Sequence, residues 1–189
     1  MKSLKSIANI RSKYKSSNPL SFGVPIITTN PLSFELPIIT TNSYQYYGRL
    51  SQSQKDSMIW VGGDNSIELN QGPLLVNNTS VWEFTTPFPE GNQCIGIQAN
   101  SYIQRPIFLS AGTHSISFFY HTRPNYPSNP VSITLSNNTI LGTIPNTSVN
   151  SWTPYSVQFF IGVDTIALLR LGGTVKYDAT TAINNIVLS

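Results

Sequence analysis

The sequence predicts an all-β fold, an antiparallel β-sandwich of about nine strands behind an extended, proline-containing N-terminal arm. Short runs of alternating apolar and polar residues recur between clusters rich in Gly, Pro and Asn, such as RPNYPSNP. This pattern is typical of an antiparallel sandwich rather than of alternating strands and helices. No segment after residue 30 sustains the i, i+3, i+4, i+7 apolar spacing of an amphipathic helix. The length of 189 residues fits one domain with an extension.

Each expected strand is a run of four to eight residues between turn signals. The nine runs are 32–39, 66–69, 93–99, 103–109, 114–121, 131–135, 155–161, 165–171 and 183–188. In 114–121 the period of two places alternate side chains on opposite faces of the sheet. The expected core-facing set is His114, Ile116, Phe118 and Tyr120.

The start of the chain carries a duplicated phrase. NPLSFGVPIITT at 18–29 is followed directly by NPLSFELPIITT at 30–41, with two substitutions between the copies. The second copy continues into the β-rich region, so we expect residues 1–29 to be a leader and arm and residues 30–189 to be the sandwich. Prolines recur every six residues, which blocks helix and leaves an extended chain.

At about 3.3 Å per residue, the 29 residues of this arm could reach roughly 95 Å. We expect the arm to add an edge strand to a neighbouring sheet by main-chain pairing. Its contact residues would be Pro19, Phe22, Val24, Pro25, Ile26 and Ile27.

Charge is concentrated in the first fifteen residues. Five of the eleven basic residues lie there, and no acid occurs before Glu35. Because its lysines and arginine carry positive charge, this basic leader is the part of the chain that we expect to contact any anionic membrane or nucleic acid. It consists of Lys2, Lys5, Arg11, Lys13 and Lys15. The leader has no apolar stretch typical of a secretory signal. Charged residues make up only 10 % of the chain, which favours assembly because copies repel one another weakly.

The residues that most often carry chemistry are scarce. Cys94 is the single cysteine, so no disulfide forms within the chain, and its strand-like surroundings predict a buried apolar role. His114 and His121 are the only histidines, and they fall on opposite faces of one strand. No nucleophile motif or carboxylate pair is recognisable. We therefore expect a noncatalytic protein.

Several segments in order resemble the galactose-binding-domain-like β-jelly rolls. They are NPLSFELP, then Trp60, then PFPEGNQCIGIQANSYIQRPIFLSAGTHSISFFYHTRPN, then 152–160, and finally YDATTAINNIVLS. The resemblance covers residues 30–189 and implies two packed antiparallel sheets. Such domains occur in carbohydrate-binding modules, plant cell-wall proteins and structural proteins of large DNA viruses.

The resemblance also implies a structural calcium in many relatives, near the opening Glu and a closing acidic pair. The Glu corresponds to Glu35, but the closing pair is replaced by Asn184 and Asn185, and Asp178 is the nearest remaining acid. Glu35 and Asp178 are thus the candidate metal ligands, and no other cofactor is expected.

Sugar binding requires aromatic faces beside paired hydrogen-bond donors and acceptors. Trp60 and Trp152 fit core positions of the resembled pattern. The candidate sugar contacts are Tyr46, Trp82, Tyr102 and Tyr126, with Gln98 or Gln104 as amide partners.

The expected function is that of a noncatalytic structural protein of a virus particle. It would be a minor capsid protein that links neighbouring subunits through its arm, with other virion proteins or its own copies as partners. The alternative is a carbohydrate-binding, lectin-like module of a cell-surface or secreted protein, with a glycan as partner.

Overall fold

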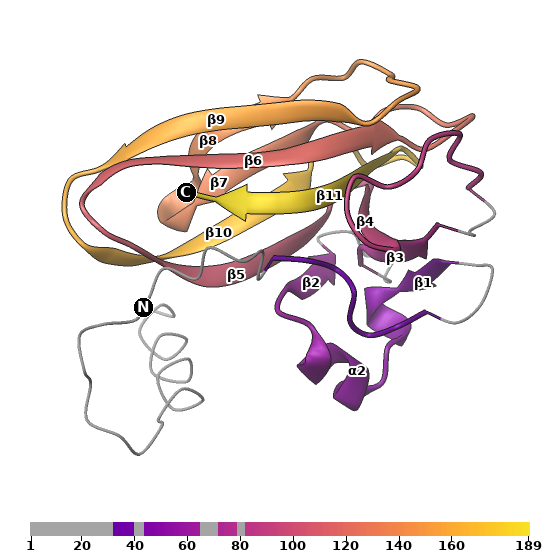
Figure 1. Cartoon of the computed structure of the whole chain (residues 1–189), viewed down its shortest axis with the longest axis horizontal. Coiled ribbons are helices and arrows are strands. Elements are labelled where there is room, and N and C mark those ends of the chain that lie inside the picture. The colour runs from indigo at the N-terminus through magenta and orange to yellow at the C-terminus, as the bar shows by residue number, and fades with distance from the viewer. Residues whose placement is uncertain (1–31, 40–43, 65–71, 79–81) are drawn as a thin grey trace.

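The computed structural model describes residues 32–39, 44–64, 72–78 and 82–189 (Figure 1). The predicted arm and basic leader, residues 1–29, lie outside this part of the chain. The described residues form eleven strands, the short helix α2 (Gln52–Ser57) and two 3-10 turns, Tyr47–Arg49 and Ser136–Asn138. They build two stacked antiparallel sheets, which confirms the predicted β-sandwich of the jelly-roll kind.

The first sheet has six strands in the order β1-β3-β4-β11-β6-β9, and the second has five in the order β2-β5-β10-β7-β8. The strands of the first sheet are β1 (Tyr44–Tyr46), β3 (Leu74–Asn77), β4 (Gln93–Gln98), β11 (Thr180–Leu188), β6 (Gly112–Thr122) and β9 (Thr153–Ile161). Those of the second are β2 (Val61–Asp64), β5 (Ser101–Leu109), β10 (Thr165–Gly173), β7 (Val131–Leu135) and β8 (Thr139–Ile144).

Seven of the nine expected strands are confirmed as β4, β5, β6, β7, β9, β10 and β11. The expected strand 66–69 lies outside the described residues. The prediction for 32–39 is wrong, because this partly buried segment joins no sheet ladder. The side chain of Gln93 takes the place of a neighbouring strand: its Nε2 donates to Phe34 O and Pro37 O, and its Oε1 accepts from Ile39 N.

The main core fills the space between the two sheets. It is mostly aliphatic, and Phe34 stacks on Trp60 with ring centroids 6.3 Å apart. Ile116, Phe118 and Tyr120 of β6 point into it, as their alternation predicts. Burial of a side chain the size of Phe34 contributes roughly 1.5–3 kcal/mol. The core therefore ties the segment 32–39 firmly to the sandwich.

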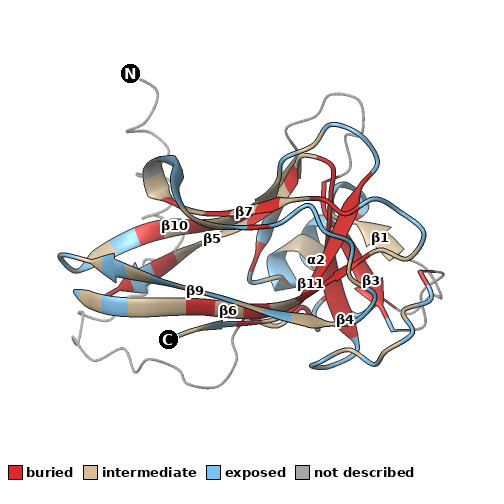
Figure 2. Cartoon of the chain, turned by 90° about the horizontal axis from the view of Figure 1, so that it is seen from above, coloured by how far each residue is buried: buried red, intermediate tan, exposed pale blue. Residues whose placement is uncertain are grey.

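A second cluster covers the outer face of the six-stranded sheet. Figure 2 shows β3 and β4 buried along their whole length, since both of their faces are covered. The outer cluster combines Leu74, Val76, Trp82, Cys94 and Ala182 with partly buried Tyr44, Tyr46, Phe84, Phe88 and Trp152. Cys94 is fully buried, as predicted, and this burial raises the pKa of its thiol well above the ordinary value.

Both histidines have packing roles. The His121 ring meets Phe84 and Trp152 edge-on in the outer cluster, with centroids 5.0 and 5.4 Å away. His114 stacks on Phe159 at 5.7 Å. None of the helices in the described ranges has the length and apolar character needed to cross a bilayer.

Candidate functional site

Two polar networks lie at the two ends of β4. We call the first the closed network; it consists of Glu35, Gln93 and Asn184, at the beginning of the strand. We call the second the open network; it consists of Gln98, Arg123, Tyr126 and Asp178, at the end of the strand. Both networks use side chains from segments far apart in the sequence.

The antiparallel pairing of three neighbouring strands brings the open network together. Thr180 at the start of β11 pairs with Gln98, and Thr181 pairs with Thr122 at the end of β6. The loops after β6 and before β11 therefore emerge side by side, at the right-hand end of the molecule in Figure 1. Arg123 N donates to Thr180 O at 3.2 Å, which fixes the start of the first loop.

The Arg123 guanidinium lies against two aromatic rings. Its Cζ is 3.6 Å from the centroid of the Tyr126 ring and 4.8 Å from that of Trp82. Such contacts hold the guanidinium plane by attraction to the ring faces. Its Nη1 is 3.9 Å from Asp178 Oδ1, an atom that also accepts a 2.6 Å hydrogen bond from Gln98 Nε2. The Asp178 carboxylate is thus held by Arg123 and by Gln98.

Strand β1 borders the open network. Tyr44 contacts both Tyr46 and Trp82, with centroids 5.6 and 5.8 Å apart, and Arg49 lies over the Tyr46 ring at 5.4 Å. Burial raises the pKa of Tyr46, and the nearby Tyr44 and Asp178 raise it further, while Arg123 and Arg49 oppose the change. Tyr44, Gln45, Tyr46 and Arg49 line a shallow hollow of about 390 Å³.

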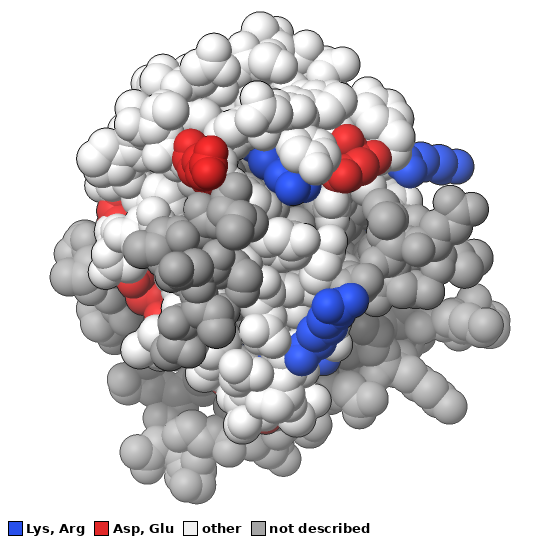
Figure 3. Space-filling model, turned by 90° about the vertical axis from the view of Figure 1, so that its right-hand side faces the viewer, with Lys and Arg blue, Asp and Glu red and all other residues white. Residues whose placement is uncertain are grey.

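The open network presents an aromatic ring beside both a donor and an acceptor. Tyr126 is 39 % exposed as a residue and the Asp178 side chain is 50 % exposed, whereas the Arg123 side chain is mostly covered. Figure 3 faces this end of the molecule and shows its few charged side chains scattered over a mainly uncharged surface. A ring face packs against apolar CH groups, and the neighbouring carboxylate and guanidinium can pair with hydroxyl groups.

The structure brings three of the four expected sugar contacts to this end, namely Tyr46, Tyr126 and Trp82. Of these, Trp82 is only 3 % exposed as a residue, and Arg123 lies over its ring, so it supports the site from below. Tyr102 is elsewhere: it lies on the outer face of the other sheet, where Arg170 stacks on its ring at 3.5 Å. Gln98 belongs to the open network, whereas Gln104 lies on β5.

Sequence reasoning missed Arg123, and it assigned Asp178 to a metal rather than to this network. A signal for Arg123 exists in the turn sequence RPNYP. Arg123 and Tyr126 are three residues apart there, and Tyr126 N donates to Arg123 O at 3.2 Å. A turn of this size returns the two side chains to the same side of the chain.

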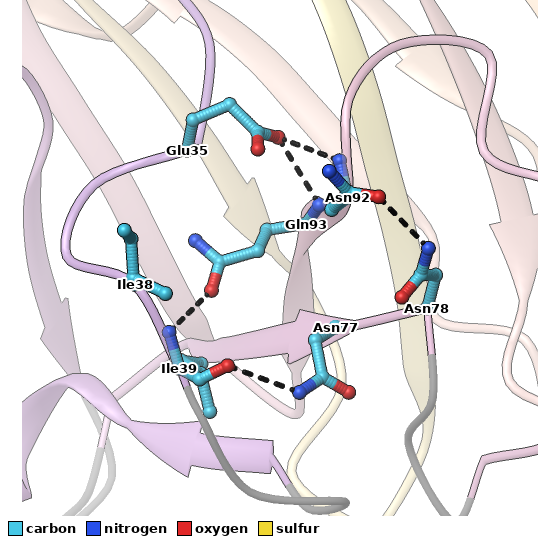
Figure 4. A pocket seen from close by; sticks show the side chains of 7 residues that line it. All are labelled: Glu35, Ile38, Ile39, Asn77, Asn78, Asn92 and Gln93. Carbon is cyan, nitrogen blue, oxygen red and sulfur yellow. Dashed lines mark hydrogen bonds between the residues drawn. The ribbon is translucent and has the colours of Figure 1, made fainter.

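The closed network fastens the N-terminal segment to the sandwich. Figure 4 shows the Glu35 carboxylate directed at the main chain of Asn92 and Gln93; Oε1 accepts from their N–H groups at 3.0 and 3.1 Å. Asn77 Nδ2 donates to Ile39 O at 3.2 Å. A hollow of about 270 Å³ lies between these groups, and the exposed Ile38 also lines it.

The residues present do not fit the structural calcium that the family resemblance implies. Asn184 Nδ2 donates to two carbonyls, Glu90 O at 3.0 Å and Gln93 O at 2.9 Å, so an amide already satisfies oxygens that a cation would need. Glu35 and Asp178 contact opposite ends of β4 and share no site. In the described part of the chain, no three His, Cys, Asp or Glu side chains gather as a metal site.

Comparison with known proteins finds similarity in fold only. No protein-family model and no curated protein matches the sequence. Among solved structures, the K2 cleaved adhesin domain of Lys-gingipain is 9 % identical with a TM-score of 0.55, over 77 % of this chain and 96 % of that one.

Two carbohydrate-binding modules are similar at lower TM-scores. TmCBM61, solved in complex with β-1,4-galactotriose, is 12 % identical with a TM-score of 0.48, over 69 % of this chain and 87 % of that one. The CBM22-1 xylan-binding domain of Paenibacillus barcinonensis Xyn10C is 9 % identical with a TM-score of 0.48, over 78 % of this chain and 92 % of that one. Structural neighbours of the sandwich thus include carbohydrate-binding modules.

Proposed function

We propose that this protein is a noncatalytic carbohydrate-binding domain and that the open network is its glycan site. The observation that carries the proposal is the exposed Tyr126 ring, which Arg123 supports from one face while Asp178 lies beside it. Sugars present apolar CH faces and rims of hydroxyl groups, so this combination of ring, donor and acceptor suits them.

The support beneath the site favours binding. Arg123 packs between the Tyr126 and Trp82 rings, and Gln98 fixes Asp178, so the contact groups are held before a ligand arrives. Side chains that are already ordered lose little conformational entropy on binding. The hollow lined by Tyr44, Gln45, Tyr46 and Arg49 is a further surface beside β1 that could accept part of a longer glycan.

This function corresponds to the alternative expected from the sequence, and a cell-surface or extracellular location accompanies it. The particle-protein expectation rests on the N-terminal arm, and that arm lies outside the described residues. No feature of the described residues indicates a capsid role, so the glycan site has the stronger support.

The test is a glycan array screened with the full chain, followed by calorimetric titration of the glycan that binds. Tyr126→Ala and Arg123→Ala should each weaken binding about tenfold or more, since one stacking or charged hydrogen-bond contact is worth about 1–3 kcal/mol. Tyr102→Ala is the matched control, because Tyr102 also carries an arginine on its ring but lies on the other sheet.

Tyr102→Ala should bind like the unmodified protein. Absence of binding to any glycan would contradict the proposal. Unchanged affinity in both Tyr126→Ala and Arg123→Ala would show that a glycan binds elsewhere.

A further inference from the structure

The segment 32–39 lies in a groove that we call the cradle, formed by Trp60, Asn77, Asn92 and Gln93. Leu32, Phe34 and Ile39 are the buried anchors of the segment. Most of its polar contacts use main-chain atoms: Trp60 Nε1 donates to Leu32 O at 3.3 Å, Gln93 Nε2 to Phe34 O at 2.7 Å, and Asn77 Nδ2 to Ile39 O. Any sequence with the same apolar anchors can make these main-chain bonds.

The upstream copy of the duplicated phrase retains every buried anchor. Leu20, Phe22 and Ile27 occupy the places of Leu32, Phe34 and Ile39. The copies differ at only two positions. Val24 stands where Leu36 is, and Leu36 is 54 % exposed. Gly23 stands where Glu35 is, so the upstream copy lacks the carboxylate that accepts from Asn92 N and Gln93 N.

We propose that the cradle binds residues 20–27 of the same chain as a second occupant, in place of residues 32–39, and that Glu35 decides between the two. Ile39 is separated from Tyr44, the first residue of β1, by four residues, and Ile27 is separated from it by sixteen. Lengthening a loop from four to sixteen residues costs only a factor of about 8 in closure probability. The length of the chain therefore allows either copy of the phrase to occupy the cradle.

The two hydrogen bonds to the Glu35 carboxylate provide the larger preference. Charge-assisted bonds of this kind and the shorter loop together favour the downstream copy by a factor of roughly 10³ to 10⁵. The upstream copy is thus a reserve occupant that fills the cradle when the downstream copy is damaged or displaced. The exchange would also lengthen the tether to β1, whose Tyr44 and Tyr46 border the open network.

The test is a mutant cycle in the full chain with the melting temperature as readout. Phe34→Asp places a charge in the cradle and disables the downstream copy, whereas Phe22→Asp disables only the upstream copy. Phe22→Asp alone should leave the melting temperature unchanged. Phe34→Asp alone should lower it by about 10–15 °C and keep a cooperative transition, and the double variant should lose at least another 10 °C or fail to fold.

Hydrogen exchange identifies the occupant directly. Ile39 N donates to Gln93 Oε1 at 2.7 Å, so its amide should exchange slowly in the unmodified chain. In Phe34→Asp, slow exchange should move to the Ile27 amide. Adding Gly23→Glu to Phe34→Asp should raise the melting temperature by about 5 °C or more, whereas Val24→Leu, the matched control, should not.

Two results would overturn the proposal. One is equal damage in Phe34→Asp and in the double variant, with no protection at Ile27, because the upstream copy would then not fit the cradle. The other is a Phe34→Asp chain whose melting temperature rises with protein concentration, because the occupant would then come from a second chain. Neither result depends on whether the open network binds a glycan.

Discussion

The two ends of β4 carry similar side chains in opposite surroundings. In the closed network, Gln93 and Asn184 are 3 % and 2 % exposed, and their amides bond to main-chain groups on both sides. In the open network, Gln98 holds a carboxylate that is half exposed. Buried and fully paired polar groups hold a fold together, whereas held but exposed groups remain available to a ligand. We therefore expect the closed end of β4 to stabilise the fold and the open end to carry the proposed glycan site.

The largest expected effect is at the closed end, from Gln93→Leu. This change leaves Phe34 O, Pro37 O and Ile39 N without their present partner. Because a buried unpaired group costs about 1–3 kcal/mol, the free energy of unfolding should fall by about 3 kcal/mol or more in urea titrations. Gln98→Leu, the equivalent change at the open end, should cost about 1 kcal/mol. If both variants lost the same free energy of unfolding, the two ends of β4 would not differ in their contribution to stability.

The next effect is at the open end, from Asp178→Ala. Glycan affinity should fall about tenfold by calorimetric titration, since a charged hydrogen bond to a ligand is worth about 1.5–3 kcal/mol. The free energy of unfolding should change by less than about 1 kcal/mol, because the Asp178 ion pair with Arg123 is long and half exposed. A large loss of stability with normal binding would reverse the assignment.

A smaller effect concerns pH and the cluster beneath the open network. Burial lowers the pKa of His121, although main-chain hydrogen bonds at Thr122 and Asn150 oppose this. As the pH falls, His121 is therefore protonated in the unfolded chain before it is protonated in the folded protein. In the unfolded chain the pKa of His121 is about 6.5, so the free energy of unfolding should be greatest above that pH. It should decrease as the pH falls from about 6.5 through the lower pKa of the folded state. Urea midpoints at several pH values measure this, and His121→Phe should flatten the profile in that window.

The smallest expected effect is that of chelation. Because the Asn184 amide bonds to the carbonyls of Glu90 and Gln93, neither EDTA nor added Ca²⁺ should shift the melting temperature by more than about 1 °C. Differential scanning fluorimetry is sufficient for this measurement. A calcium-dependent rise of several degrees would mean that the folded chain binds the cation, which would contradict this expectation.

The sequence predicted the long strands well because their alternation extends over many residues. The faces of β6 are an example, with Ile116 and Phe118 inside as expected. The short strands β1, β2, β3 and β8 were missed, since three to six residues give little periodicity and tertiary pairing decides them. The segment 32–39 has strand-like composition, yet a glutamine side chain rather than a strand satisfies its main chain.

The candidate site was partly predictable. Aromatic type alone selected Tyr46 and Tyr126, which lie at this end of the molecule, and it also selected Tyr102, which lies on the other sheet. That any of them contacts a sugar stays a prediction. Sequence reasoning did not identify the partnership of Arg123 with Asp178, because these residues meet only through the pairing of β6 with β11. Burial of Trp82 depends on the same long-range packing.

Amide chemical shifts of the labelled full chain, recorded during titration with the glycan selected by array screening, would locate the glycan site residue by residue. If the open network binds the glycan, the shifts should be concentrated at 44–46, 98, 123–126 and 176–178, with Asn92, Gln93 and Asn184 unchanged. Shifts centred on the closed network, or on the face that carries Tyr102 and Arg170, would contradict it.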